Sequence, residues 1–137
     1  MANIKSFDPE LLETREVHRL LSSAIAPRPI AFASTIDAKG NVNLSPFSFF
    51  NVFSSNPPIL IFSPARRVRD NTTKHTLQNA TETKEVVINT VDFSIVEQMS
   101  ETSREFDKGV NEFTETGLTE VPSVKVKPPR VMESPVS

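Results

Sequence analysis

Several cationic side chains fall within ten residues of one another: Arg66, Arg67, Arg69, Lys74 and His75. Hydroxyl-bearing residues are interleaved with them at Ser63, Thr72, Thr73 and Thr76. Guanidinium groups and hydroxyls match the oxygens of a phosphate in charge and in geometry. A run of charges is more often a solvated loop than a site, and one phosphate needs only a few such partners. The pattern therefore indicates a phosphate site that uses some of these residues, with a solvated loop as the alternative.

An aromatic segment with small hydroxyl side chains precedes the cations. It contains Ser45, Phe47, Ser48, Phe49, Phe50 and Phe53. Alternation along a strand places Phe50 on the opposite face from the other phenylalanines, and we expect some of these rings to lie in the core. Because serine lets a planar ring approach the backbone closely, the segment suits a flat ring. A flat ring next to a phosphate site matches flavin mononucleotide, FMN.

Composition excludes several other kinds of cofactor site. The glycines, Gly40, Gly109 and Gly117, lie too far apart for a GxGxxG or GxxxxGK motif, so a Rossmann site and a P-loop are excluded. The chain has no cysteine, which excludes thiolate and iron–sulfur chemistry. Ring contacts must come from Phe or His, because Trp and Tyr are absent. The sequence shows no Ser–His–Asp arrangement, paired carboxylates or metal-ligand spacing, so we predict no catalytic side chain and no metal.

Length and charge are those of one globular domain, which we expect to span residues 1–137. Hydrophobic residues make up 37% and charged residues 23% of the chain, as in ordinary globular proteins. The net charge of −2 gives no indication of a nucleic-acid partner. Apolar runs are far shorter than the ~20 residues that span a bilayer, and the N-terminus lacks a signal-peptide core. We therefore expect a cytoplasmic protein without membrane or nucleic-acid partners.

The first element that positions the site is a helix. Asp8 and Pro9 predict its start, through an N-terminal cap and a proline in the first turn. His18 lies on this helix and is expected to play no part in the site. The prolines on both sides of Arg28 force extended backbone. We interpret Arg28 as structural, with contact to a flavin or a nicotinamide phosphate as the alternative.

The remaining elements alternate between strands and short helices. In chain order we expect a strand at 30–35, a hairpin turn at 37–41, one long strand at 42–53, a turn at 54–58, a strand at 59–62 buried on both faces, a helix at 73–82, a strand at 85–91 and a helix from Asp92 or Ser94 through Met99. Pro46 cannot donate to a sheet ladder and should mark a bulge or an unpaired edge. The chain after Glu101 is polar and proline-rich, and is expected to be mostly irregular. This order predicts a mainly β, α+β domain with an antiparallel sheet closing toward a barrel.

Several segments carry a resemblance to a known family. In order they read APRPIA (26–31), NLSPFSFF (43–50), NPP (56–58), KHTLQN (74–79), EVVIN (85–89) and PRVMESPV (129–136). Together they resemble the flavin reductase-like family over almost the whole chain. The resemblance implies an FMN-binding split β-barrel of the flavoredoxin and NAD(P)H:flavin oxidoreductase type. Family members continue past the position of Val136, so we expect the C-terminal strands to be lacking, through truncation or with a partner subunit covering the gap.

The resemblance also implies where the cofactor binds. Family members hold the flavin ring largely through backbone amides and small hydroxyls of the strand that matches 43–53. The predicted ring contacts are Ser45, Phe47, Ser48, Phe49 and Phe50. The predicted contacts at the phosphate end are Ser63, Arg66, Arg67, Lys74 and Thr76.

The implied activity is that of an FMN-dependent oxidoreductase. NADH or NADPH would reduce the flavin, which would pass electrons to a second flavin, to oxygen or to a partner monooxygenase. The family also implies a homodimer. Two alternatives stay open: an FMN-binding electron-relay or sensing module that does not oxidise nicotinamide, and an inactive fragment of the family.

Overall fold

The centre of the molecule is a three-stranded antiparallel sheet in the order β2-β1-β5. The computed structural model describes residues 4–67 and 70–137. The middle strand, β1 (Ala31–Ile36), pairs with β2 (Val42–Phe47) on one side and with β5 (Val87–Asn89) on the other. Among the described residues, β2 is therefore an edge of this sheet.

The turn between β1 and β2 is the predicted hairpin. Gly40 has a φ of +91°, in the region that favours glycine. The Asp37 carboxylate accepts the backbone N–H groups of Lys39 and Asn41, both at 2.9 Å. Pro46 lies on the edge strand, where its missing N–H costs no ladder bond. The prediction that Pro46 marks an edge is confirmed.

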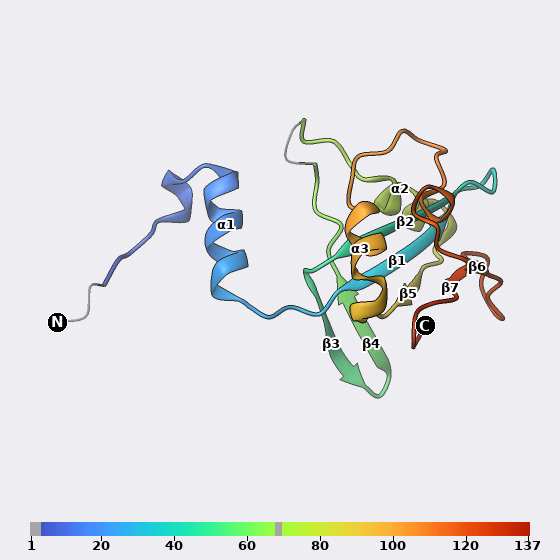
Figure 1. Ribbon diagram of the computed structural model, residues 1–137. Coiled ribbons are helices and arrows are strands. Elements are labelled where there is room, and N and C mark those ends of the chain that lie inside the picture. Colours follow the sequence, from blue (N-terminus) through green and yellow to red (C-terminus); the bar gives the residue numbers. More distant parts are fainter. Residues whose placement is uncertain (1–3, 68–69) are drawn as a thin grey trace.

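The single long strand predicted at 42–53 is wrong. The strand is interrupted at Ser48 and Phe49. The next strand, β3 (Phe50–Ser55), forms a separate two-stranded sheet with β4 (Pro58–Phe62). This β3–β4 hairpin projects from the rest of the molecule (Figure 1).

The burial predicted for both faces of the strand at 59–62 is also wrong. Ile59, Leu60 and Ile61 are 41%, 49% and 50% exposed. Their apolar character predicted a central strand, but β4 pairs only with β3 among the described residues and both lie outside the central sheet. The hairpin therefore presents apolar side chains to solvent.

Helices begin and end partly as expected. They are the 3-10 turn Pro9–Leu11, α1 (Thr14–Ala24), α2 (His75–Thr83), the 3-10 turn Phe93–Ile95, α3 (Val96–Glu101) and α4 (Glu112–Thr116). Asp8 caps only the short 3-10 turn, so α1 starts later than predicted. Asp92 caps the next 3-10 turn by accepting the Ser94 N–H. The predicted helices at 73–82 and after Asp92 are confirmed.

The two faces of the central sheet carry different layers. One face packs a cluster against α3 and α4, made of Phe32, Leu44, Ile95, Phe113, Leu118 and Val131. The other face packs Ala31, Ala33 and Phe47 against the start of the β3–β4 hairpin and against α2. A small third sheet, β6 (Glu120–Val121) with β7 (Arg130–Val131), lies beside β5. The Asn89 side chain on β5 joins the central sheet to β7, because it donates to the Phe32 carbonyl on β1 and accepts from the Val131 N–H on β7.

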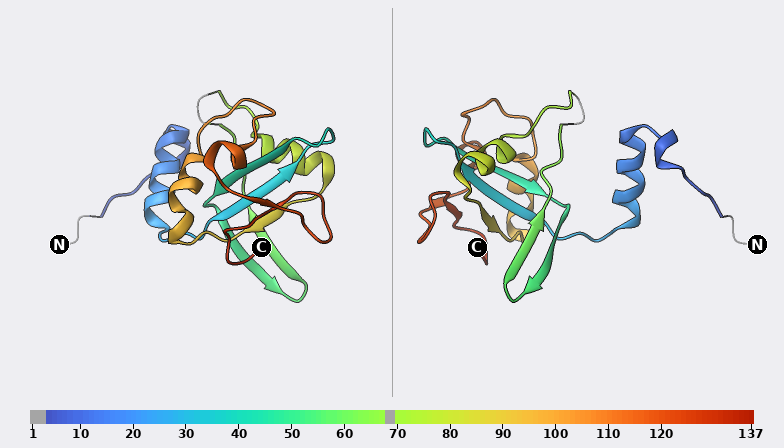
Figure 2. Two further views of the ribbon diagram at one scale, coloured as in Figure 1. Left: turned by 45° about the vertical axis from the view of Figure 1, so that its right-hand side comes forward. Right: turned by 180° about the vertical axis from the view of Figure 1, so that it is seen from behind.

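Helix α1 stands apart from this body, on an extended connection to β1 (Figures 1 and 2). None of its residues, all within the described part of the chain, is buried. No helix in residues 4–67 or 70–137 has the length and apolar character needed to cross a membrane.

Candidate functional site

A cleft of about 500 Å³ lies along the outer edge of β2. Its walls come from β2, from the loop after β4, from the segment that follows α3, from α4 and from α1. The lining residues are His18, Asn43, Ser45, Pro46, Ala65, Arg66, Arg67, Lys74, His75, Thr102, Ser103, Arg104, Glu105, Phe106 and Glu112. The predicted residues Ser45, Arg66, Arg67 and Lys74 are thus brought together.

Arg67 stabilises the conformation of the cationic loop through hydrogen bonds to other residues of that loop. Its guanidinium donates to the Thr73 carbonyl (2.5 Å) and to the Thr72 hydroxyl (3.1 Å), and lies 3.4 Å from His75 Nε2. Its backbone N–H also donates to the Thr72 carbonyl. Most of its donors are therefore committed to the fold of the loop.

Arg66 has more of its guanidinium available. Its Nε donates to the Asn71 carbonyl at 2.7 Å, which fixes the orientation of the side chain. Within the described residues, no hydrogen bond uses its two terminal nitrogens. An exposed arginine whose Nε is fixed and whose terminal nitrogens face solvent suits the bidentate capture of phosphate.

Lys74 and His75 are crowded by positive charge. Burial, followed by the charge of Arg67, lowers the pKa of Lys74. The same two causes, in the same order, lower the pKa of His75. The Lys74 ammonium lies 5.0 Å from the centroid of the Phe47 ring. Cations held together at a cleft form a site for an anion, and perturbed pKa values of this kind gather at functional sites.

The structure places the predicted ring contacts differently from one another. Ser45 lines the cleft. Phe47 is only 4% exposed and stacks against Phe62 with centroids 5.3 Å apart, so it belongs to the core. Phe50 is half-buried in the same cluster. Ser48 and Phe49 lie at the break between β2 and β3, outside the residues that line the cleft.

The hydroxyls predicted at the phosphate end also lie outside the lining. Ser63 is exposed, and its backbone N–H donates to the Phe49 carbonyl. Thr76 is 1% exposed, and its hydroxyl accepts the Asn43 amide at 3.0 Å. Arg69 lies outside the described residues. Cofactor contact by Ser63 or Thr76 stays a prediction.

Arg28 ties α1 to the break between β2 and β3. Its guanidinium donates to the carbonyls of Ser22 (2.5 Å) and Ile25 (2.6 Å), and its Nε donates to the Ser48 hydroxyl (3.3 Å). It also lies over the Phe49 ring, 5.9 Å from the centroid. These contacts support the structural interpretation of Arg28.

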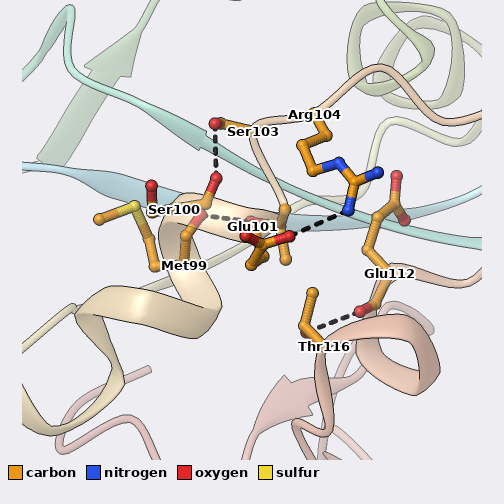
Figure 3. A network of polar contacts seen from close by, with 8 residues as sticks. Met99, Ser100, Glu101, Ser103, Arg104, Glu112 and Thr116 are labelled. Atoms are coloured by element: carbon orange, nitrogen blue, oxygen red, sulfur yellow. Dashed lines mark hydrogen bonds and ion pairs between the residues drawn. The ribbon is translucent and has the colours of Figure 1, made fainter.

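Sequence reasoning missed the residues that reach the cleft from distant elements. His18 lines it from α1 and lies 5.5 Å from the Phe49 ring, although it was expected to take no part. Arg104 enters from the end of α3, where it pairs with Glu101 at 3.1 Å (Figure 3). No local pattern marks these positions, because only the tertiary fold brings them to β2.

Glu112 was missed as well, and it is 4% exposed. It starts α4, which Asn111 caps by accepting the Phe113 N–H. Its Oε2 accepts the Leu44 N–H at 3.0 Å. Burial raises the pKa of this carboxyl, and the backbone N–H groups of Leu44 and of Glu112 itself oppose that shift only in part.

The cleft therefore combines a cationic loop, a strand edge and a buried acid. Among the described residues, no group of His, Cys, Asp and Glu side chains is arranged to hold a metal ion. The donor set fits a ligand that carries an anion at one end. It defines a binding cleft for an anionic cofactor or substrate.

Comparison with known proteins identifies the family. Residues 23–137 match the flavin reductase like domain, and the chain belongs to the flavin reductase-like family. It is 45% identical to an uncharacterized protein of Aquifex aeolicus over 121 residues, which cover 88% of this chain and 61% of the relative. The chain spans about three fifths of the length of the relatives it matches.

Solved structures agree with this family. Nitrilotriacetate monooxygenase component B from Bacillus cereus has a TM-score of 0.90 at 30% identity, over 98% of this chain and 65% of that one. A protein with a split barrel domain from Shewanella frigidimarina, assigned as a flavin reductase, has a TM-score of 0.76 at 33% identity, over 95% and 64% of the two chains. The predicted split-barrel type of fold is confirmed, and the described residues form separate small sheets without closing a barrel.

Proposed function

We propose that this chain binds FMN in the β2 cleft and acts as a flavin reductase-like oxidoreductase that uses NADH or NADPH. The observation that carries the proposal is the gathering of Arg66, Arg67, Lys74 and His75 at one cleft beside the edge of β2. Membership of the flavin reductase-like family supports the flavin as the ligand. A single anionic end in the cleft favours FMN, with one phosphate, over a dinucleotide.

The side chains divide the work of holding this cofactor. The terminal nitrogens of Arg66 and the Lys74 ammonium bind the phosphate, while Arg67 holds the loop in shape through Thr72 and Thr73. Ser45 and the neighbouring backbone of β2 lie against the ring. When bound, the flavin supplies the hydride-accepting chemistry, and the protein supplies orientation, charge and access.

Two assays test the proposal in sequence. Titration of FMN, FAD and riboflavin, followed by quenching of flavin fluorescence, should show FMN as the tightest ligand. Consumption of NADH and NADPH should then depend on added FMN. If FMN binds but NADH and NADPH are not consumed, the electron-relay or sensing module is favoured over the reductase. FAD binding as tight as that of FMN would contradict the assignment of FMN as the cofactor. Absence of binding to all three flavins would leave the inactive fragment.

We also propose partners for the chain. The monooxygenase component B among the structural neighbours supports delivery of reduced flavin to a partner monooxygenase. Exposed apolar side chains on α1 and on the β3–β4 hairpin support a homodimer, because monomers rarely expose large apolar patches. The most exposed of these are Leu21 on α1, Ile25 directly after α1, and Val52 and Phe53 on β3. The cytoplasmic location stays a prediction.

A further inference from the structure

The floor of the cleft holds a carboxyl that the proposed mechanism does not use. Glu112 is nearly fully buried, yet it lines the cleft. Its Oε2 accepts the outward N–H of Leu44 on the edge strand β2. In the described part of the chain, no other residue is assigned as a donor to its second oxygen, Oε1; besides Leu44, only the backbone N–H of Glu112 itself acts on this carboxyl. In Figure 3 the Glu112 side chain points away from α4, while its backbone carbonyl accepts the Thr116 hydroxyl at 2.7 Å.

The other buried carboxylate of the fold makes the contrast clear. Asp37 accepts two backbone N–H groups and the side-chain amide of Asn41, and these bonds lower its pKa. For Glu112, burial outweighs the N–H groups of Leu44 and of Glu112 itself, and so raises its pKa. A carboxyl with few donors in a buried site favours its protonated form, which can itself donate a hydrogen bond.

Glu112 and Lys74 meet β2 at different positions along the strand. Glu112 meets the strand at Leu44, whereas Lys74 lies over Phe47, three residues further along. At about 3.3 Å per residue, this is a separation of about 10 Å along the strand. A ligand whose phosphate lies at Lys74 and whose chain follows β2 therefore presents its far end to Glu112.

We propose that Glu112, in its protonated form, donates a hydrogen bond from Oε1 to an acceptor atom on the flavin ring, so that ring binding in this cleft is coupled to proton uptake. This inference rests on the proposed function, because it takes the flavin as the ligand. It assigns Glu112 as a ring-recognition residue in addition to its bond to Leu44. Flavin affinity should then be higher where the carboxyl is protonated and fall as the pH rises through its pKa.

Other titratable groups face the same cleft and have to be separated from Glu112. They are His18 from α1, Arg66, Arg67, Lys74 and His75 from the loop and the start of α2, and Arg104 and Glu105 from the segment after α3. On the elements packed against α4, α3 carries Glu97 and Glu101, and β2 carries no titratable side chain. His75 is the main competitor in the pH range of interest, because its side chain also lines the cleft.

Riboflavin is the probe that isolates the ring end. It carries no phosphate, so neither the titration of a phosphate nor its contact with the cations enters the measurement. Its dissociation constant, measured by fluorescence between about pH 5 and pH 8, should rise with pH by up to about tenfold per unit for the unmodified protein. In Glu112→Gln the amide oxygen still accepts from Leu44 and the amide N–H₂ donates to the ring at every pH. The pH dependence should therefore vanish in this variant.

Two further variants serve as controls. Glu115→Gln removes a carboxylate from the exposed face of the same helix, and should keep the pH dependence. His75→Gln removes the competing titration of the cleft histidine, and should keep the pH dependence as well. Calorimetry on the unmodified protein, in two buffers of different ionisation enthalpy, should show uptake of protons on riboflavin binding at the pH where affinity falls, and this measurement does not depend on the folding of any variant.

The outcomes distinguish the two proposals. Absence of binding of FMN and riboflavin at every pH refutes the proposed function. If riboflavin binds with the same pH dependence in Glu112→Gln as in the unmodified protein, or if His75→Gln abolishes that dependence, the role of Glu112 is refuted alone. Binding without proton uptake refutes it too.

Discussion

Replacing Arg66 by alanine gives the sharpest test of the phosphate end of the cleft. Arg66 is exposed, and its only assigned hydrogen bond within the described residues runs from Nε to the Asn71 carbonyl. Its terminal nitrogens should therefore act on the ligand more than on the fold. A charge-assisted hydrogen bond contributes about 1.5–3 kcal/mol, and exposure to solvent favours the lower end of that range. A loss of about 1.5 kcal/mol corresponds to roughly tenfold weaker FMN binding.

The assay compares two ligands that differ only in the phosphate. Arg66→Ala should weaken FMN about tenfold and leave riboflavin almost unchanged, and added salt should reduce the difference by screening. Lys125→Ala is the matched control, because Lys125 is an exposed cation that does not line the cleft. If FMN and riboflavin weaken equally in Arg66→Ala, the arginine acts through the fold and the phosphate assignment fails.

The remaining predictions concern the supports of the cleft. Glu112→Ala should lower the free energy of unfolding by about 1–3 kcal/mol, because the buried Leu44 N–H loses its acceptor; an unchanged urea midpoint would contradict this. Arg28→Ala should increase amide exchange across α1 while leaving β1 protected, which hydrogen-exchange mass spectrometry would measure. Equal exchange of α1 in the variant and in the unmodified protein would show that Arg28 does not hold α1 in place. The double substitution Phe53→Ser and Leu60→Ser should convert the proposed dimer to monomer in sedimentation equilibrium while the far-UV circular dichroism spectrum stays that of the folded protein; a dimer of unchanged affinity would exclude the hairpin as the interface.

Local signals predicted the central hairpin, α2 and the cationic loop. The glycine of the polar turn at Gly40 and the alternating pattern of β1 are each determined by a few neighbouring residues, so both can be recognised in the sequence. The loop cations were predicted as a set, but the different tasks of Arg66 and Arg67 depend on which carbonyl each guanidinium meets. That partner is set by the path of the loop, which composition does not reveal.

The errors have a common physical origin in tertiary placement. The apolar strand at 59–62 looks the same whether it is central or forms a projecting hairpin, because periodicity reports side-chain type and not what covers it. At the break after Phe47, Ser48 accepts a hydrogen bond from Arg28, which lies 20 residues earlier in the chain and is not part of any local pattern. Helix α4 spans only five residues, too few for a periodic signal, and so the buried position of Glu112 could not be foreseen.

Helix α1 has a consequence for the energetics of the cleft. Since it buries none of its residues, its opening should require far less free energy than unfolding of the central sheet. Its anchors are the Arg28 bonds to its C-terminal carbonyls and the contact of His18 with Phe49. When these anchors release, one wall of the cleft leaves together with His18, while the hydrophobic clusters around Phe32 and Phe47 stay intact. The rate at which a ligand enters or leaves can therefore be set by local unfolding of α1, independently of the global stability of the domain.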